Sequence, residues 1–475
     1  MNALSNLSAT SAPTPSTPAP APSSPPETPA GPSDFEFSYN AQDEVVLAPR
    51  TQTVHGVTVG TTLTIEKAHL GDRLAPNSQG QYVFDSSDVA SQTAAISFAA
   101  VARTIDVFEG ALGQPIAWAF PGSLSVHPDN GPDFNAYYMR SGHSVNFFHG
   151  LDPKTGQTIM SGASGEVVSH EVGHAILDGL RPAYMKSWTP DVGAFHESFG
   201  DVVAMLMSLQ DDATVQRVVA QTGGDLSKPS CLADIGEQLG IGINDKAGGD
   251  VTGGNYVRTA RNDFKYRDPR LGTEVHDLSR LWTGTFYDVL SGIQARNMAA
   301  GMDAASALRA TGGEGLKLVA NLLKEAPQAD FTFPDMARAL LTSDQKYDHG
   351  ANHDLLAQVL GGRGLLSTAS MNAAPRGEVR DVDVPLTGPG DYGQFQGALV
   401  RTTVESDGSR AANTTITHRV RENLAGLIAA GRIRYTDPGQ KVRDADRFDA
   451  KGQPYIGIVR WEDGQMIIER NPVLA

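Results

Sequence analysis

The chain has 475 residues, enough for two or three domains with sizeable cores, and no apolar stretch long enough to span a bilayer. Its 38 basic and 54 acidic residues give a net charge of −16, which disfavours nucleic acid and anionic membranes as partners. The single cysteine, Cys231, excludes an intrachain disulfide.

Residues 1–33 are predicted to form a disordered tail. They are rich in proline, serine and alanine, so they have too few apolar side chains to build a core. A solvated tail is one interpretation, and a ligand for a proline-binding module is the other. The first ten residues lack the basic and apolar regions of a secretory signal, which predicts a cytoplasmic protein.

Residues 34–165 are predicted to form a β-rich lobe. Short runs at residues 44–47 and 57–65 are strand-like, because β-branched and other apolar residues dominate them. Residues 90–110 predict a long helix that ends at a glycine. Two further strands are expected at residues 124–126 and 144–148.

A histidine pair in the next segment predicts a metal site. His170 and His174 are four positions apart in the sequence HEVGH, so on a helix both imidazoles lie on one face, where one zinc ion can accept them. Glu171, beside the first histidine, can reach a water on the metal without being a ligand. The alternative is a buried helix with two ordinary histidines.

A second helical pattern supplies a third ligand. Glu197 follows His174 by 23 positions (197 − 174), enough for a loop and a return to an antiparallel helix. Two histidines and one glutamate leave the fourth position of zinc open for water, as in catalytic sites. Asp201, one turn beyond Glu197, can accept the free N–H of a ligand histidine. We therefore predict a catalytic Zn²⁺ site formed by His170, His174 and Glu197.

These motifs resemble those of the thermolysin-like zinc metalloproteases. HEVGH followed by a distant GAFHESFGD carries the resemblance, which covers about residues 55–370. It implies an α+β fold with two lobes, the β-rich N-terminal one and a helical zinc-binding one at residues 166–373. It also implies a metalloendopeptidase that acts on peptide or protein substrates, with Glu171 as general base. His196 departs from the family, which has asparagine before the ligand glutamate. It could contact the surroundings of a ligand histidine, compete as a metal ligand or lie on the surface.

The resemblance implies roles for four residues around the zinc ion. Asn135 and Ala136 match an element that holds a substrate backbone along a strand edge, although a plain strand end is an equally good interpretation. Tyr184 matches, with an offset of one position, a tyrosine that hydrogen-bonds the tetrahedral intermediate; a half-buried loop anchor is the alternative. Arg258 matches an arginine that binds a substrate carbonyl, with a solvated arginine as the alternative.

The family also has a histidine that donates a hydrogen bond to the oxyanion, and His276 matches it. The alternative is a polar neighbour of a helix start. The acidic residue that orients this histidine in the family has no counterpart at the expected spacing. Asp268, Glu274 and Asp277 are therefore three open alternatives for that role.

Calcium and export are two family features that the sequence does not support. Glu166 keeps one carboxylate of a family calcium site, but Ser208 stands eleven positions past Glu197, where another is expected. Calcium binding is thus left open without support. Family members are mostly exported with an inhibitory propeptide, which is not evident here, so secretion by a non-standard route also stays open.

Residues 374–475 are predicted to form a small α+β extension without a chemical motif. A strand is expected at residues 392–404, a helix at 415–431 and a hairpin at 455–470. Substrate docking, partner binding and packing are equally open roles for it, and the sequence does not indicate an oligomeric state.

Two other functions are compatible with the same residues. The protein could hold zinc as a non-catalytic binding scaffold, or it could hydrolyse a non-standard amide. The intact Glu171 argues against a scaffold, which needs no base there. Asn135, Ala136 and Arg258 argue for ordinary peptides as substrates.

Overall fold

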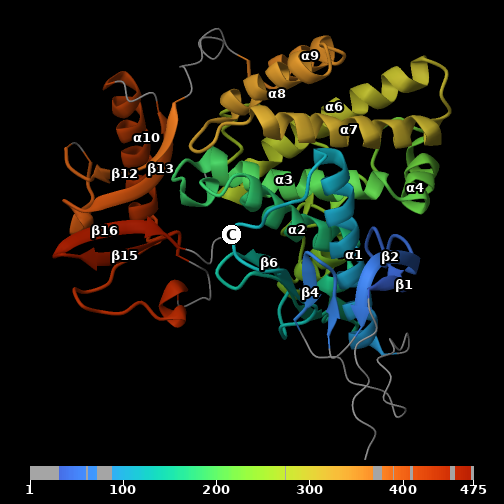
Figure 1. Ribbon diagram of the computed structural model, residues 1–475, viewed down its shortest axis with the longest axis horizontal. Coiled ribbons are helices and arrows are strands. Elements are labelled where there is room, and N and C mark those ends of the chain that lie inside the picture. Colours follow the sequence, from blue (N-terminus) through green and yellow to red (C-terminus); the bar gives the residue numbers. More distant parts are fainter. Residues whose placement is uncertain are drawn as a thin grey trace, which may run out of the picture.

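Figure 1 shows the computed structural model, which describes residues 32–59, 62–71, 88–272, 274–366, 377–388, 390–406, 410–449 and 455–471. The predicted tail lies outside these ranges except for its last two residues. The chain is α+β, with a mixed sheet first, a helical region in the middle and a mixed five-stranded sheet near the C-terminus. In the ranges given, no helix has both the length and the apolar character of a membrane span.

The first sheet has seven strands in the order β1-β2-β3-β4-β5-β7-β6. They are β1 (Ser33–Tyr39), β2 (Arg50–Val59), β3 (Leu63–Thr64), β4 (Ala68–Leu70), β5 (Leu124–His127), β6 (Ala136–Met139) and β7 (Ser144–Phe147). β5 is parallel to both of its neighbours, and the other pairs are antiparallel. The strand predicted at residues 44–47 is wrong. Val46 and Leu47 both donate their backbone N–H to the carbonyl of Asp43, which makes this run a turn.

The long helix predicted in this region is confirmed as α1 (Val89–Leu112). Asp88 caps its start by accepting the N–H of Ser91. The helix ends at Gly113 rather than at Gly110, because only Gly113 adopts the left-handed conformation, with φ of 70°. α1 packs against β1 and against the first helix of the central region, so it joins the sheet to the helix that carries His170 and His174.

The central region consists of helices with four short strands. The helices are α2 (Gly165–Leu180), α3 (Pro190–Leu209), α4 (Asp212–Thr222), α5 (Glu237–Ala247), α6 (Val275–Ala299), α7 (Ala304–Glu325), α8 (Phe333–Tyr347) and α9 (His353–Gly362). The strands pair as β8 (His149–Leu151) with β9 (Thr158–Met160) and β10 (Asp234–Ile235) with β11 (Arg258–Thr259). α3 packs between α2 and α6, and these three helices carry most of the predicted site residues.

The last sheet has the order β12-β13-β16-β15-β14 and is covered by one helix. Its elements are β12 (Glu378–Pro385), β13 (Leu399–Ser406), α10 (Arg410–Ala429), β14 (Ile433–Arg434), β15 (Gly457–Glu462) and β16 (Gln465–Arg470). The predicted helix and hairpin are confirmed, the latter turning at Asp463 and Gly464 with φ of 49° and 81°. The strand predicted at residues 392–404 is shorter, because a 3-10 turn (Gly393–Phe395) precedes it.

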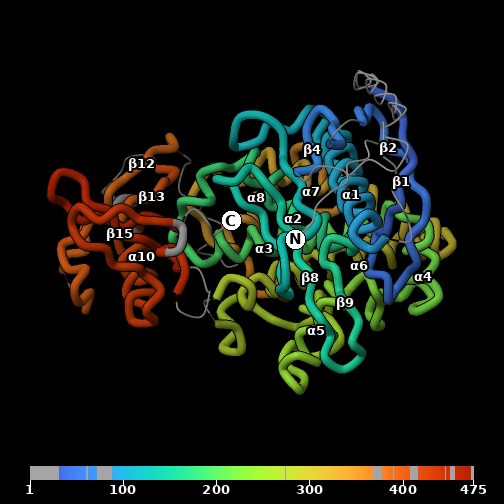
Figure 2. The backbone as a smooth tube through the Cα atoms, turned by 90° about the horizontal axis from the view of Figure 1, so that it is seen from below, coloured from blue at the N-terminus to red at the C-terminus, as the bar shows by residue number. Residues whose placement is uncertain are grey.

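A tryptophan from the helical region joins the core of this last sheet. Trp188 precedes α3, is 2% exposed and packs in one apolar cluster with Val400 of β13. Its ring N–H donates to the carbonyl of Arg401 at 2.9 Å. A Cβ at Gly457 would lie 2.6 Å from the ring, so this strand passes directly over it. The C-terminal sheet is therefore attached to the segment that joins α2 and α3. Figures 1 and 2 both show the C-terminal unit on this side of the helical region.

Candidate metal centre

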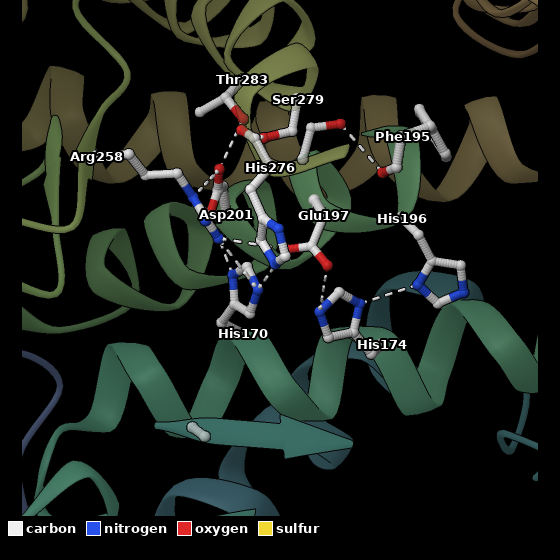
Figure 3. Close-up of polar contacts among 12 residues, drawn as sticks. His170, His174, Phe195, His196, Glu197, Asp201, Arg258, His276, Ser279 and Thr283 are labelled. Carbon is white, nitrogen blue, oxygen red and sulfur yellow. Dashed lines mark hydrogen bonds and ion pairs between the residues drawn. The ribbon is translucent and has the colours of Figure 1, made fainter. Parts of the chain in front are cut away.

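Three side chains from α2 and α3 form a group that could hold a metal ion (Figure 3). Ligand atoms of His170, His174 and Glu197 all lie within 4.8 Å of one another. The two carboxylate oxygens of Glu197 are 3.6 Å from Nε2 of His170 and 3.8 Å from Nε2 of His174. Two donors bound tetrahedrally at about 2.1 Å lie about 3.4 Å apart, so the group fits a metal ion.

Two glycines allow α2 and α3 to approach closely enough to form this group. A Cβ at Gly200 of α3 would lie 2.7 Å from the ring of His170, and one at Gly173 of α2 would lie 3.2 Å from the Cα of Gly200. These two glycines therefore leave the room that the imidazoles occupy between two buried helices. A third, Gly165 at the start of α2, allows a different contact, because a Cβ there would overlap the carbonyl oxygen of Asn40.

His170 is supported by a buried carboxylate. Oδ1 of Asp201 lies 3.1 Å from its Nδ1, although the ring is not aligned for a linear hydrogen bond. Asp201 is fully buried and accepts hydrogen bonds from Nε of Arg258 at 2.8 and 2.9 Å and from the hydroxyl of Thr283 at 2.8 Å. These donors hold its charge, so the pKa of Asp201 lies below its usual value although burial opposes this.

Arg258 is not a solvated arginine. Its side chain is 12% exposed, and its Nη2 lies 3.3 Å from Nε2 of His170 and 3.6 Å from Glu197. Together with its pair to Asp201, these contacts fix a cation beside the metal group. Its predicted contact with a substrate carbonyl stays a prediction.

Glu171 lies on α2 between the two histidines and is 6% exposed. Burial raises the pKa of its carboxyl to about 7, with the charge of His170 lowering it and that of Glu197 raising it further. A hydrogen bond from the backbone of Tyr138 in β6 contributes a smaller decrease. The carboxyl therefore lies between the metal group and β6, in a position from which it can exchange protons with groups at the metal.

His276, at the start of α6, lies beside the metal group. Its Nε2 is 3.4 Å from Glu197, and its Nδ1 is 2.6 Å from Glu274. Glu274 is therefore the partner among the three acids considered: Asp268 binds Arg270, and Asp277 accepts the N–H of Gly272. The charges of Glu197 first, and of Glu274 second, raise the pKa of His276, while partial burial opposes them.

Tyr184 lies in the core. It is 3% exposed, its hydroxyl donates to the carbonyl of Pro327 at 2.5 Å, and its ring packs edge-on against Phe195 and Phe331. The predicted role of Tyr184 in binding a reaction intermediate is therefore wrong, because a buried hydroxyl already paired with a carbonyl is not available to substrate. The alternative of a loop anchor describes its position.

Asn135 and Ala136 lie at the start of β6, the last strand of the first sheet. The side chain of Asn135 accepts the N–H of Ala136 at 2.9 Å, and its carbonyl accepts a hydrogen bond from Ser161 at 2.8 Å. Among the residues that the structure describes, Ala136 pairs with Phe147 of β7 on one side only. An unpaired side of β6 could bind an extended chain, but a substrate role for these two residues stays a prediction.

His196 contacts a predicted metal ligand, which is one of the alternatives left open for it. Its Nδ1 lies 2.9 Å from Nδ1 of His174, so one of the two nitrogens must donate. Burial lowers the pKa of His196 to about 4, which keeps it neutral. We assign His174 as donor, because this leaves the Nε2 of His174 free for a metal. The position one residue before Glu197 was the only signal in the sequence.

A second group of carboxylates surrounds the start of α2. Oxygens of Asp43, Glu166 and Glu237 lie within 4.8 Å of one another, and Oε2 of Glu237 is buried without a hydrogen-bond partner in the described ranges. Such an oxygen-only group suits a hard cation such as Ca²⁺. Ser208, where a ligand was expected, instead accepts a hydrogen bond from Gln42 at 2.5 Å. The sequence missed Asp43 and Glu237 because long-range folding alone brings them together.

We predict that Glu237→Gln stabilises the metal-free protein at pH 8. Burial, and then the charge of Asp43, raise the pKa of Glu237 from 4.5 to about 8. Between these values the native state holds more protons than the unfolded state, so stability falls as pH rises. The glutamine cannot ionise, so the variant does not lose stability in this way as pH rises. We expect its melting temperature to exceed that of the parent by about 3–6 °C at pH 8.

The measurement is thermal unfolding of both proteins in metal-free buffer at pH 4.5 and pH 8. The advantage of the variant should nearly vanish at pH 4.5. The exposed Glu378→Gln is the matched control and should change neither value. A lower melting temperature for Glu237→Gln at pH 8 would contradict the electrostatic explanation.

No protein-family model matches this chain, and no curated protein matches it.

Proposed function

We propose that this protein is a zinc-dependent endopeptidase in which Glu171 is the general base. The observation that carries the proposal is the position of Glu171, whose buried carboxyl lies beside the His-His-Glu metal group without belonging to it. A structural metal site would not need a carboxyl of this kind in addition to its ligands. Peptide or protein substrates are supported by the resemblance to thermolysin-like metalloproteases.

The donor set supports zinc. Two imidazole nitrogens and one carboxylate oxygen are typical of zinc, whereas calcium and magnesium prefer oxygen ligands only. Three protein ligands leave a coordination position for water or substrate. Zinc held there supplies a Lewis acid that makes water nucleophilic at neutral pH.

The side chains around the metal group divide the proton transfers. Glu171 accepts the proton of the attacking water and passes it to the leaving amine nitrogen. His276, held by Glu274, donates a hydrogen bond from Nε2 to the former carbonyl oxygen as negative charge develops on it. Arg258, held in place by Asp201, adds positive potential beside His170 and Glu197.

The substrate would lie as an extended chain along β6. This strand ends its sheet, and the backbone of its residue Tyr138 reaches Glu171. In this proposal Asn135 and Ala136 pair with the substrate backbone by β-addition. The two lobes of a thermolysin-like fold would then be the first sheet and the helical region, with the substrate between them.

The proposal is tested by digestion of unfolded casein. Protein loaded with one zinc per chain should cleave it, removal of zinc by a chelator should stop cleavage, and stoichiometric zinc should restore it. Bound zinc without any cleavage would contradict the proposal and favour a binding scaffold or a hydrolase of a non-standard amide.

We also predict that Glu274→Gln lowers kcat about tenfold with little change in KM. The variant keeps an acceptor for the helix start but loses the charge that orients His276. Because Glu274 contributes to the raised pKa of His276, the alkaline limb of the rate profile should move to lower pH. Steady-state kinetics on a fluorogenic peptide at several pH values measure both effects.

Asp277→Asn is the control for this prediction. Asp277 is the neighbouring acid that was also considered, but it bonds the backbone of Gly272 rather than His276. A larger loss of kcat in Asp277→Asn than in Glu274→Gln would overturn the assignment of the orienting acid.

A further inference from the structure

A buried carboxylate of α2 is bound by one side chain of β6 and by that of the residue directly after this strand. Asp178 is 0% exposed and lies four positions after His174 (178 − 174). One of its oxygens accepts hydrogen bonds from the hydroxyl of Tyr138 and from Nε of Arg140, both at 2.7 Å, and the other accepts one from Nη2 of Arg140. Within the described ranges, these two residues supply every hydrogen bond to the carboxylate. Neither the metal group nor the proton transfers proposed above account for this contact.

These contacts fix the place of β6 along α2. Tyr138 and Arg140 are two positions apart, the spacing at which side chains of a strand point to the same side. Arg140 also donates to the carbonyl of Pro182, just beyond the end of α2, at 2.9 Å. The backbone N–H of Tyr138 reaches Glu171, which is seven positions before Asp178 (178 − 171) and about 10 Å from it along the helix axis. β6 is therefore held at two levels of α2, beside which it lies in Figure 1.

The charge of Asp178 makes this attachment resistant to movement. A buried carboxylate that loses its partners is strongly destabilising, whereas two parallel bonds from a guanidinium hold it in both distance and orientation. If β6 slid by one residue, the side chains of Tyr138 and Arg140 would turn to the opposite face, because side chains alternate along a strand. Asp178 would then lose all three hydrogen bonds, so the strand has one stable position on the helix.

The helix that holds β6 also carries two residues of the metal group, His170 and His174. β6 is the strand along which the substrate is proposed to bind, and a misplacement of about 1 Å between reacting groups lowers a rate about 100-fold. We propose that Asp178 is a positioning residue, which acts through Tyr138 and Arg140 to set where a peptide bound along β6 lies relative to the metal group. The inference rests on the proposed peptidase function and deepens it, because it names the residues that align the substrate.

The test compares peptides that share one central sequence and are extended stepwise from one to four residues on either side of the cleaved bond. For the unmodified protein, kcat/KM should rise about tenfold with length, the gain expected from added hydrogen bonds to β6. Tyr138→Phe, which removes one donor to Asp178, should reduce this gain to about threefold. Arg140→Leu and Asp178→Asn should each remove most of it. Arg140→Lys, which keeps the charge but not the two parallel bonds, should retain more of the gain than Arg140→Leu.

Tyr287→Phe is the matched control. Tyr287 is another buried tyrosine whose hydroxyl donates a hydrogen bond, to the carbonyl of Leu226 at 2.9 Å, and its variant should keep the full gain. Melting temperature shows that each variant is folded. Zinc affinity, measured by competition with a chromogenic chelator, should stay close to that of the parent, because Asp178 is outside the metal group. Binding of labelled short and long peptides to zinc-loaded Glu171→Gln, measured by fluorescence anisotropy, reports the alignment without turnover.

The outcomes separate the two proposals. Variants that lose stability but keep the full gain would show that Asp178 serves folding alone, which would overturn the inference and leave the peptidase standing. Loss of zinc affinity together with the gain would also overturn it, because the effect would then act through the metal group. Absence of cleavage by the unmodified protein at every length would overturn the peptidase. In that case, tighter binding of long peptides to Glu171→Gln, lost on adding Tyr138→Phe, would still support the alignment of a peptide on β6, and equal binding would overturn it.

Discussion

Glu171→Gln is expected to lower kcat for peptide hydrolysis about 1,000-fold or more while the protein still binds one zinc per chain. The amide has nearly the same shape as the carboxyl but cannot accept the proton of the attacking water. Because Glu171 is not among the metal-group residues, the variant should keep the metal. The measurements are initial rates on a fluorogenic peptide and zinc content after dialysis.

Glu166→Gln provides a matched control for this result. It makes the same substitution on the same buried helix, one turn before His170, at a residue outside the metal group. We expect it to retain both zinc and hydrolysis within a few-fold. Hydrolysis above one tenth of the parent rate in Glu171→Gln would exclude Glu171 as the base.

Asp201→Asn is expected to reduce the free energy of unfolding of the metal-free protein by about 3 kcal/mol and to weaken zinc binding 10- to 100-fold. The substitution removes the carboxylate that Arg258 contacts at 2.8 Å in a fully buried position. The guanidinium of Arg258 then remains as a buried cation next to His170. The only metal-group carboxylate beside it is that of Glu197, at 3.6 Å. It also removes the charge beside Nδ1 of His170.

Chemical denaturation of the metal-free protein and competition for zinc with a chromogenic chelator measure the two effects. Thr283→Val, which removes only one neutral donor to Asp201, should cost about 1 kcal/mol and leave zinc affinity nearly unchanged. Equal losses in both variants would show that packing, rather than the charge of Asp201, supports the site.

The metal group could be predicted because it depends on local helix geometry. A spacing of four positions places His170 and His174 on one face of any helix. Glu197 reaches this face if the chain returns in a second, antiparallel helix. The partner of His276 could not be chosen this way. Glu274 precedes α6 in an extended conformation, with φ −69° and ψ 134°, and this turns its carboxylate back to a residue only two positions later.

Contacts between distant segments were beyond prediction. Asp43 reaches Glu166 and Glu237 through the packing of an N-terminal turn on two helices, for which the sequence has no periodic signal. Tyr184 failed for a related reason: a matching residue type in a loop does not determine the direction in which its side chain points. The helices α1, α2, α3 and α10 and the C-terminal hairpin were predicted because caps, glycines and periodicity mark them locally, whereas α4, α5 and α7 were missed. The proposed domain limits stay a prediction.

The attachment of Trp188 to the last sheet has a consequence for biosynthesis. Arg470, which lies over the Trp188 ring, is made 282 residues later (470 − 188). At a usual translation rate of 5–20 residues per second, this interval lasts about 15–55 s. During that time the segment before Glu197 lacks its final packing partner. The packing of the segment that leads into α3, the helix that carries Glu197, is therefore completed only after Arg470 has been synthesised.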